Sequence, residues 1–89
     1  MLIPVRTRQF EQDFKKVLRR GKDLKKLKAI MAKLAAQENL DSKHRDHKLS
    51  GNFKDRRECH IEPDWLLIYK IEGDKIIFER TGSHSDLFR

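Results

Sequence analysis

The spacing of the apolar residues changes near the middle of this chain, and that change limits its fold more than any other feature. In the first half, apolar residues recur every three or four positions, which is the pattern of a helix with one buried face. The second half instead holds three short runs of strand-forming residues, separated by tight-turn residues. The sequence therefore predicts helices first and a small sheet afterwards.

Two helices are predicted in the first half. Residues 7–20 place apolar side chains at helical spacing and end before Gly21, a common helix stop. Residues 23–37 form the second helix, with Asp23 as the residue that caps its start. Its buried stripe consists of Leu24, Leu27, Ile30, Met31, Leu34 and Ala35. We expect the pair to form an antiparallel helical hairpin.

Three strands are predicted in the second half, at residues 57–62, 65–71 and 75–81. Two-residue turns join them at 63–64 and 73–74, so the strands form an antiparallel meander. We therefore expect an α+β fold, in which the two N-terminal helices pack on a small antiparallel sheet.

The turns also predict which strand residues lie side by side. The predicted cross-strand rows are His60–Leu67–Arg80 and Glu58–Tyr69–Phe78. An acid, a histidine and an arginine would then lie within reach of one another on one face of the sheet. The residues expected on the other face, beneath the helices, are Cys59, Ile61, Leu66, Ile68 and Ile77.

The charge of the chain indicates which classes of partner it can bind. It holds 21 Lys and Arg against 14 Asp and Glu, which gives a formal net charge of +7. Such a surface favours RNA, DNA or an acidic protein as the partner. With 89 residues, the chain is expected to form a single domain that spans residues 1–89.

Cysteine content and hydropathy predict the compartment. Cys59 is the only cysteine, so the chain cannot form an internal disulfide. The first residues carry charges and lack the apolar run of a signal peptide. No apolar run approaches the roughly 20 residues that a membrane helix needs. We expect a cytoplasmic protein with no membrane segment.

Three histidines stand where a small RNA-cutting site could form. His47 lies in a long polar connection at 39–52, His60 on the first predicted strand, and His84 in the tail. Histidine exchanges protons near neutral pH, so a convergent set suggests acid–base catalysis. Cutting RNA this way needs a base for the 2′-OH, an acid for the leaving 5′-oxygen and cations for the phosphate, but no metal or cofactor.

Other residues could support these histidines. Glu58 and Asp64 are candidates to orient the rings or to act as bases. Arg80 and Lys54 are candidates to hold the phosphate. Phe88 is either part of the core or a platform on which an RNA base stacks. These residues also have non-catalytic explanations. Surface histidines are common, and aspartate is favoured in turns such as the one at Asp64.

A metal site is not expected. The available donors are His44, His47, Cys59, His60 and His84. Their spacing matches no strong zinc pattern, and a single cysteine is a poor basis for a structural site. The sequence therefore predicts neither a metal nor a cofactor.

Three stretches of the second half together are distinctive of one family. They are HKLSG at 47–51, RECHIEPDWLLIYK at 57–70 and FERTGSHSDLF at 78–88. In these stretches, and in its two-helix front half, the chain resembles the YafQ-like branch of the RelE/ParE toxin superfamily. The resemblance implies a RelE-like fold and a bacterial toxin of a type II toxin–antitoxin system. Such a toxin cuts messenger RNA in the decoding site of the ribosome until a cognate antitoxin blocks it.

The resemblance also implies the site residues. The family's functional positions fall on His47, His60, Asp64, His84 and Phe88. Where the branch has an aspartate two residues before the strand histidine, this chain has Glu58, which keeps the charge on a longer side chain. The implied chemistry is attack by the RNA's own 2′-OH, which gives a 2′,3′-cyclic phosphate and a 5′-hydroxyl without metal.

Two other functions stay open at this stage. ParE-like members of the same superfamily inhibit DNA gyrase by binding it, although they lack this histidine set. An RNA-binding regulatory module with incidental histidines would also fit the positive charge.

Overall fold

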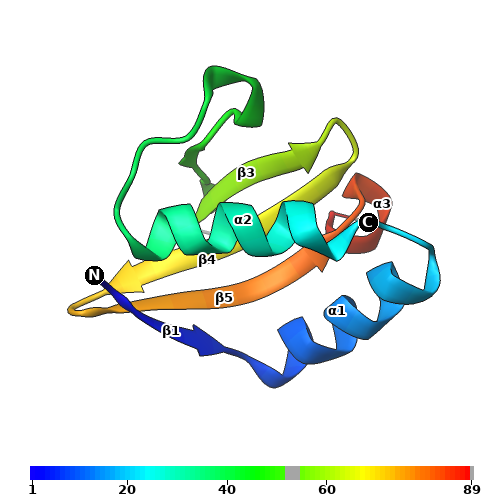
Figure 1. Ribbon diagram of the computed structural model, residues 1–89, viewed down its shortest axis with the longest axis horizontal. Helices are drawn as coiled ribbons and strands as arrows, with labels where there is room; N and C mark the ends of the chain where they lie inside the picture. Colours follow the sequence, from blue (N-terminus) through cyan, green and yellow to red (C-terminus); the bar gives the residue numbers. More distant parts are fainter. Residues whose placement is uncertain (52–54, 89) are drawn as a thin grey trace.

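The computed structural model describes residues 1–51 and 55–88, which form a five-stranded sheet with two helices on one face (Figure 1). The elements are β1 (Ile3–Arg6), α1 (Arg8–Arg19), α2 (Leu24–Ala35), η1 (Ser42–His44), β2 (His47–Lys48), β3 (Arg57–Glu62), β4 (Trp65–Glu72), β5 (Lys75–Gly82) and α3 (His84–Leu87). The strand order across the sheet is β1-β5-β4-β3-β2. The expected α+β fold is confirmed. Among the described residues, no helix combines the length and apolar character needed to span a membrane.

Both long helices begin after a side chain that accepts a backbone hydrogen bond. Thr7 Oγ1 accepts from the N–H of Phe10, and Asp23 Oδ1 from the N–H of Lys25, both at 3.0 Å. Gly21 follows α1 with a φ of +79°, the left-handed conformation that glycine adopts at little cost. The predicted helices are confirmed, with ends that differ from the prediction by at most two residues.

The helices pack on the sheet rather than on each other. α1 lies mainly against β5, where the ring of Phe10 is 6.1 Å from the ring of Phe78, while α2 lies against β3. The predicted pairing of the helices as a hairpin is therefore wrong. The chain does reverse direction between them (Figure 1), but each helix buries its apolar face on the strands.

Both predicted β-hairpins are confirmed, and two strands lie outside the prediction. Glu62 is opposite Trp65 and Glu72 is opposite Lys75, across two-residue turns. β1 pairs with β5 in parallel, and the two-residue β2 pairs with β3 in antiparallel orientation. The sheet is therefore mixed, where the sequence predicted an antiparallel one.

The predicted register holds near each turn, where the Tyr69–Phe78 pair is confirmed, but beyond an irregularity in each hairpin it is wrong by one residue. One lies at the end of β3 and the other in the middle of the β4–β5 pairing. The observed rows are His60–Leu66–Gly82 and Glu58–Ile68–Arg80. Leu67 and Tyr69, the partners predicted for His60 and Glu58, instead lie in the core beneath the helices.

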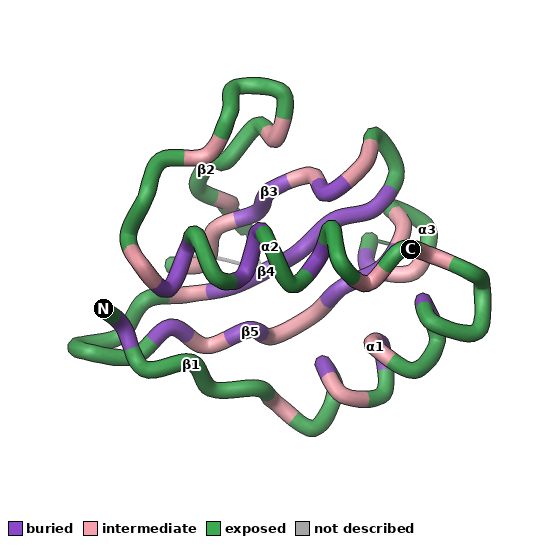
Figure 2. Tube along the Cα trace, in the orientation of Figure 1, coloured by how far each residue is buried: buried purple, intermediate pink, exposed green. Residues whose placement is uncertain are grey.

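The sheet has an apolar side and a mixed side. Cys59 and Ile61 lie in the main core under the helices, as predicted. The residues expected there but found outside that core are Leu66, Ile68 and Ile77. Leu66 and Ile68 pack with Leu87 of α3 on the other side. Buried residues follow β4 and β5 through the middle of the molecule (Figure 2). Because side chains alternate along a strand, the side away from the helices carries Glu58 and His60.

Candidate active site

A buried carboxylate lies between two of the candidate histidines. Glu58 on β3 is directly opposite His47 on β2, and its side chain is only 7% exposed. Glu58 Oε1 lies 3.2 Å from Nε2 of His60 and 3.7 Å from Nε2 of His47. A carboxylate in this position can stabilise positive charge on either ring.

The backbone of its own loop orients His47. The Nδ1 atom of His47 lies 2.5 Å from the carbonyl oxygen of Arg45. Because a carbonyl can only accept a hydrogen bond, Nδ1 carries the hydrogen of the neutral ring and Nε2 bears the lone pair. The basic nitrogen of His47 is therefore the one that faces Glu58.

Asp46 holds this loop against the sheet. Its Oδ1 accepts hydrogen bonds from the hydroxyl of Tyr69 at 2.5 Å and from Nε of Arg57 at 3.2 Å. Tyr69 and Arg57 are cross-strand neighbours on β4 and β3, so rigid strands fix the position of Asp46. Burial, together with the carboxylate of Asp46, raises the pKa of Tyr69 well above its usual range, so its hydroxyl remains a donor.

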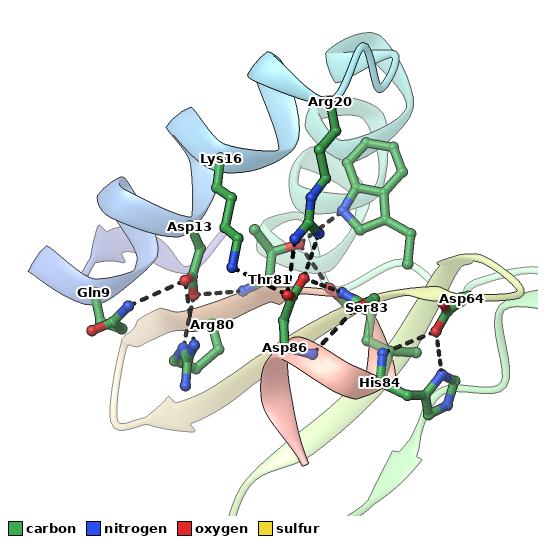
Figure 3. A network of polar contacts seen from close by, with 12 residues as sticks. Gln9, Asp13, Lys16, Arg20, Asp64, Arg80, Thr81, Ser83, His84 and Asp86 are labelled. Carbon is green, nitrogen blue, oxygen red and sulfur yellow. Dashed lines mark hydrogen bonds and ion pairs between the residues drawn. The ribbon is translucent and has the colours of Figure 1, made fainter. Parts of the chain in front are cut away.

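His84 is held by an aspartate in the β3–β4 turn. The backbone N–H and the Nδ1 atom of His84 lie 2.9 Å and 2.6 Å from Asp64 Oδ1 (Figure 3). The backbone hydrogen bond, and then the side-chain one, hold the pKa of Asp64 below its usual range, so Asp64 is ionised at neutral pH. A carboxylate bound in this way orients an imidazole and stabilises positive charge that forms on it.

His60 is at the centre of the cluster. Its ring lies 5.7 Å from the ring of His84, edge to face, and Glu58 connects it to His47. The ring of Phe88 lies 6.5 Å from that of His84 and is 42% exposed. Phe88 is therefore not part of the core, and its position beside a candidate histidine fits a stacking platform for a base.

Asp86 fixes α3, and with it His84, to α1. Its carboxylate accepts from Nη1 of Arg20 at 2.6 Å, from Nζ of Lys16 at 3.2 Å and from the N–H of Ser83 at 2.9 Å (Figure 3). These hydrogen bonds, with that of Arg20 the strongest influence, hold the pKa of Asp86 far below its usual range. The short helix at the site is thus anchored by charge as well as by packing.

Arg80 has a strong partner outside the cluster. Its Nε and Nη2 donate to Asp13 of α1 at 2.7 Å and 3.3 Å, and Asp13 also accepts from the N–H of Thr81 (Figure 3). Arg80 shares a cross-strand row with Glu58, yet the structure directs its guanidinium to a buried carboxylate on α1. Lys54, the other predicted phosphate contact, lies outside the described residues.

The sequence analysis missed Asp46 and the position of His44. The Nδ1 atom of His44 lies 2.7 Å from the carbonyl oxygen of His60, so η1 is tied to the strand that carries the central histidine. A groove of about 710 Å³ opens beside this contact, and His60 and His84 are among its lining residues. The only signal in the sequence was the length and polarity of the connection at 39–52.

The potential metal donors do not form a site in the described part of the chain. No group of three His, Cys, Asp or Glu side chains there is placed to hold a metal ion. Cys59 is fully buried under the helices, and burial raises the pKa of its thiol.

Comparisons with known proteins support this fold and also indicate the activity of the chain. A family model described as "Bacterial toxin of type II toxin-antitoxin system, YafQ" matches residues 3–89. The mRNA interferase toxin YafQ of Escherichia coli K12 is 43% identical over 81 residues, which cover 90% of this chain and 88% of that protein. The E. coli DinJ-YafQ complex contains a chain with 39% identity and a TM-score of 0.91, with full coverage of both chains.

A copper-bound mutant toxin from Helicobacter pylori is also similar in structure. It is 42% identical, with a TM-score of 0.94, and the match covers 99% of this chain and 100% of that one. The copper is a property of that protein. Since a family model covers nearly the whole chain and a relative of known activity is 43% identical, the chain belongs to the YafQ family of type II toxin–antitoxin toxins and is an mRNA interferase, an endoribonuclease.

Proposed function

We propose that this toxin cuts messenger RNA on the ribosome by histidine acid–base catalysis without a metal. The observation that carries the proposal is the gathering of three histidines from β2, β3 and α3 around two carboxylates. These residues are His47, His60, His84, Glu58 and Asp64. Such a set supplies both proton-transfer groups that RNA cleavage requires.

In the proposed reaction, Nε2 of His47 removes the proton of a ribose 2′-OH, and the 2′-oxygen attacks the adjacent phosphorus. The bond from phosphorus to the 5′-oxygen breaks, and His84 donates a proton to that oxygen. The upstream fragment then ends in a 2′,3′-cyclic phosphate, and the downstream fragment begins with a 5′-hydroxyl. Glu58 stabilises the charge that His47 gains, and Asp64 orients His84.

The remaining candidates would act on the RNA rather than transfer protons. His60 lies between the proposed base and acid, where it would donate to the phosphate. Lys54 would add positive charge, and Phe88 would stack on a base next to the cut. Arg80, which is bound to Asp13, would act on the phosphate only through its charge and not by direct contact.

A protein antitoxin is the proposed regulator. The relative in the E. coli complex is bound to DinJ, and by analogy a cognate antitoxin would bind this toxin in the bacterial cytoplasm. An acidic or apolar segment of the antitoxin would cover the histidine cluster, and the net charge of +7 favours an acidic one.

The proposal is tested by mapping cuts in a defined messenger RNA, with translating ribosomes and without them. The natural chain and His84→Ala are compared, and the fragment ends are probed for cyclic phosphate. We expect codon-phased cuts that need ribosomes, carry cyclic phosphate ends and disappear in the variant. Ribosome-independent cutting, or ends with a 5′-phosphate, would contradict the proposal.

A further inference from the structure

A groove of about 710 Å³ runs beside the histidine cluster and is lined by residues of α2, η1 and β3. Figure 1 shows where these elements lie in the fold. One wall is a single face of α2, because Lys26, Ile30 and Lys33 recur at helical spacing. The other wall is the end of η1, and the last residues of β3 contribute to the floor. The volume is within the range of about 300–1,000 Å³ that is usual for ligand sites.

The groove carries positive charge on both walls, which its own carboxylate and that of the nearby Asp41, whose pKa is lowered by a backbone hydrogen bond from Lys43 and by the charges of Lys43, His44 and Lys33, offset only in part. Its carboxylate, Glu62, already accepts from Lys22 at 3.0 Å and from Lys26 at 3.1 Å, and these hydrogen bonds lower the pKa of Glu62. The remaining basic side chains of the groove, which form no ion pair with any residue in the described ranges, are Lys33, Lys43 and Arg45. Opposed cations across a groove attract a chain of negative charges.

The groove is continuous with the proposed site of cleavage. His60 and His84 are among its lining residues, and the hydrogen bond from His44 to the carbonyl of His60 ties the η1 wall to the catalytic strand. Apolar residues of α2, β3 and the turn after β3 complete the lining, namely Ala29, Ile30, Ile61 and Pro63. Cations for phosphates beside apolar surfaces for base faces are the usual features of a site for single-stranded nucleic acid.

We infer that this groove binds the single-stranded RNA segment adjoining the cut phosphate, with its phosphates on Lys33, Lys43 and Arg45. The inference rests on the proposed function, which places the cut phosphate at the histidines. An RNA strand that passes the histidines must continue beyond them, and the groove supplies a path with the matching charge. An acidic protein segment would not require the groove to end at proton-transfer groups.

The experiment compares two triple variants with the same change in net charge. One is Lys33→Gln, Lys43→Gln, Arg45→Gln, and the matched control is Arg6→Gln, Arg8→Gln, Lys75→Gln, on exposed residues away from the groove. Binding of a fluorescent single-stranded RNA is measured by anisotropy at several salt concentrations. A second RNA carrying 4-thiouridine is cross-linked to the natural chain, and the cross-linked peptides are identified.

We expect the groove variant to lose at least tenfold in RNA affinity and about two units of salt slope, at roughly 0.7 per lost contact. The control should lose less than about threefold, since it keeps every groove contact while sharing the net charge. Cross-links should map to residues 26–33 and 43–45. Equal losses in both variants, or cross-links confined to α1, would overturn the inference.

Two outcomes separate this inference from the proposed function. If RNA binds in the groove but cutting needs neither ribosomes nor the histidines, the proposed function fails and the groove assignment stands. If ribosome-dependent cutting persists while the groove variant binds RNA normally, the nuclease stands and the groove assignment fails. A groove variant that loses affinity only for a co-purified antitoxin would assign the groove to that protein and overturn its assignment to RNA.

Discussion

Glu58 is the residue that connects His47 to the central histidine of the cluster, His60. It is buried, and its carboxylate faces the ring of His47, which would gain positive charge during proton transfer, and the ring of His60, which would donate to the phosphate. Its position follows directly from the sequence, because Glu58 and His60 are two residues apart on one strand and therefore share a face. The neighbouring β2 then brings His47 opposite to it.

Replacing Glu58 by glutamine should therefore remove charge with little change in shape. We expect Glu58→Gln to lower the rate of RNA cleavage about 10- to 100-fold, because the positive charge that forms on His47 during the reaction loses its buried counterion. The conservative Glu58→Asp keeps the charge and should retain most of the activity. The check is single-turnover cleavage at saturating protein. Equal activity of Glu58→Gln and the natural chain would remove this residue from the mechanism.

Elements and turns were predictable from local patterns, whereas pairings between distant segments were not. The hairpins follow from Pro63-Asp64 and Gly73-Asp74, which are local signals. The parallel pairing of β1 with β5 joins residues about 70 positions apart, so no local pattern indicates it. The two irregularities shift the register by one residue without a distinctive sequence.

Part of the candidate site was predictable for the same reason. The family motifs mark the histidines and Asp64, which the structure brings together. From the sequence, the long side chain of Arg80 could extend towards the histidine cluster or towards α1. Only the packing of α1 on the sheet determines that it binds Asp13. Asp46 and His44 act through contacts across the fold, which the polar connection in which they lie does not reveal.

The Asp46–Tyr69 contact should position the loop that carries His47. We expect Tyr69→Phe to lower the free energy of unfolding by about 1 kcal/mol and cleavage by about tenfold, because the loop loses its buried donor. Asp46→Asn should act similarly. The double variant should lose little more than either single one, since both changes break the same contact. Fully additive losses in urea unfolding and in cleavage would show that the two residues act separately.

The anchoring of α3 should make stability depend on pH through Asp86. Because the folded pKa of Asp86 is lowered, its contribution is complete above the ordinary pKa of aspartate, declines below it and vanishes at the lowered folded value. We expect Asp86→Asn to lower the free energy of unfolding by about 1–2 kcal/mol at neutral pH. The expected loss is no larger because Lys16 and Arg20, the partners of Asp86, are half-exposed, so that solvent screens their charges. The difference from the natural chain should shrink as the pH falls from 5 towards 2, measured by chemical denaturation. Glu38→Gln, on an exposed residue, serves as the control; a pH-independent difference for Asp86→Asn would contradict the account.

At the scale of the molecule, the proposed catalytic groups and the cations of the long helices lie on different parts of the surface. The exposed cations of α1 and α2 include Lys15, Arg19, Lys25 and Lys28. The histidine cluster lies instead where β2, β3 and α3 meet. This arrangement would allow the helices to grip ribosomal RNA while the site reaches the messenger RNA.

Ribosome binding should accordingly depend on salt and on the helix surface. We expect Lys25→Glu with Lys28→Glu to weaken ribosome binding at least several-fold and to reduce its salt dependence, because phosphate contacts are lost. Lys75→Glu, at the far end of β5, changes an exposed cation away from both helices and should have a smaller effect. The measurement is co-sedimentation with ribosomes over a range of salt concentrations. If both changes weakened ribosome binding equally, the effect would come from net charge in general and not from the surface of the helices.

The most direct test of the account is a messenger RNA in which the ribose before the cut phosphate lacks its 2′-OH. The toxin is added to ribosomes programmed with this RNA or with the unmodified one. If the histidines act by activating the 2′-OH, the unmodified RNA is cut with a cyclic phosphate end, and the modified RNA stays intact at that position. A cut at the deoxyribose position would show that water is the nucleophile and would contradict the proposed mechanism.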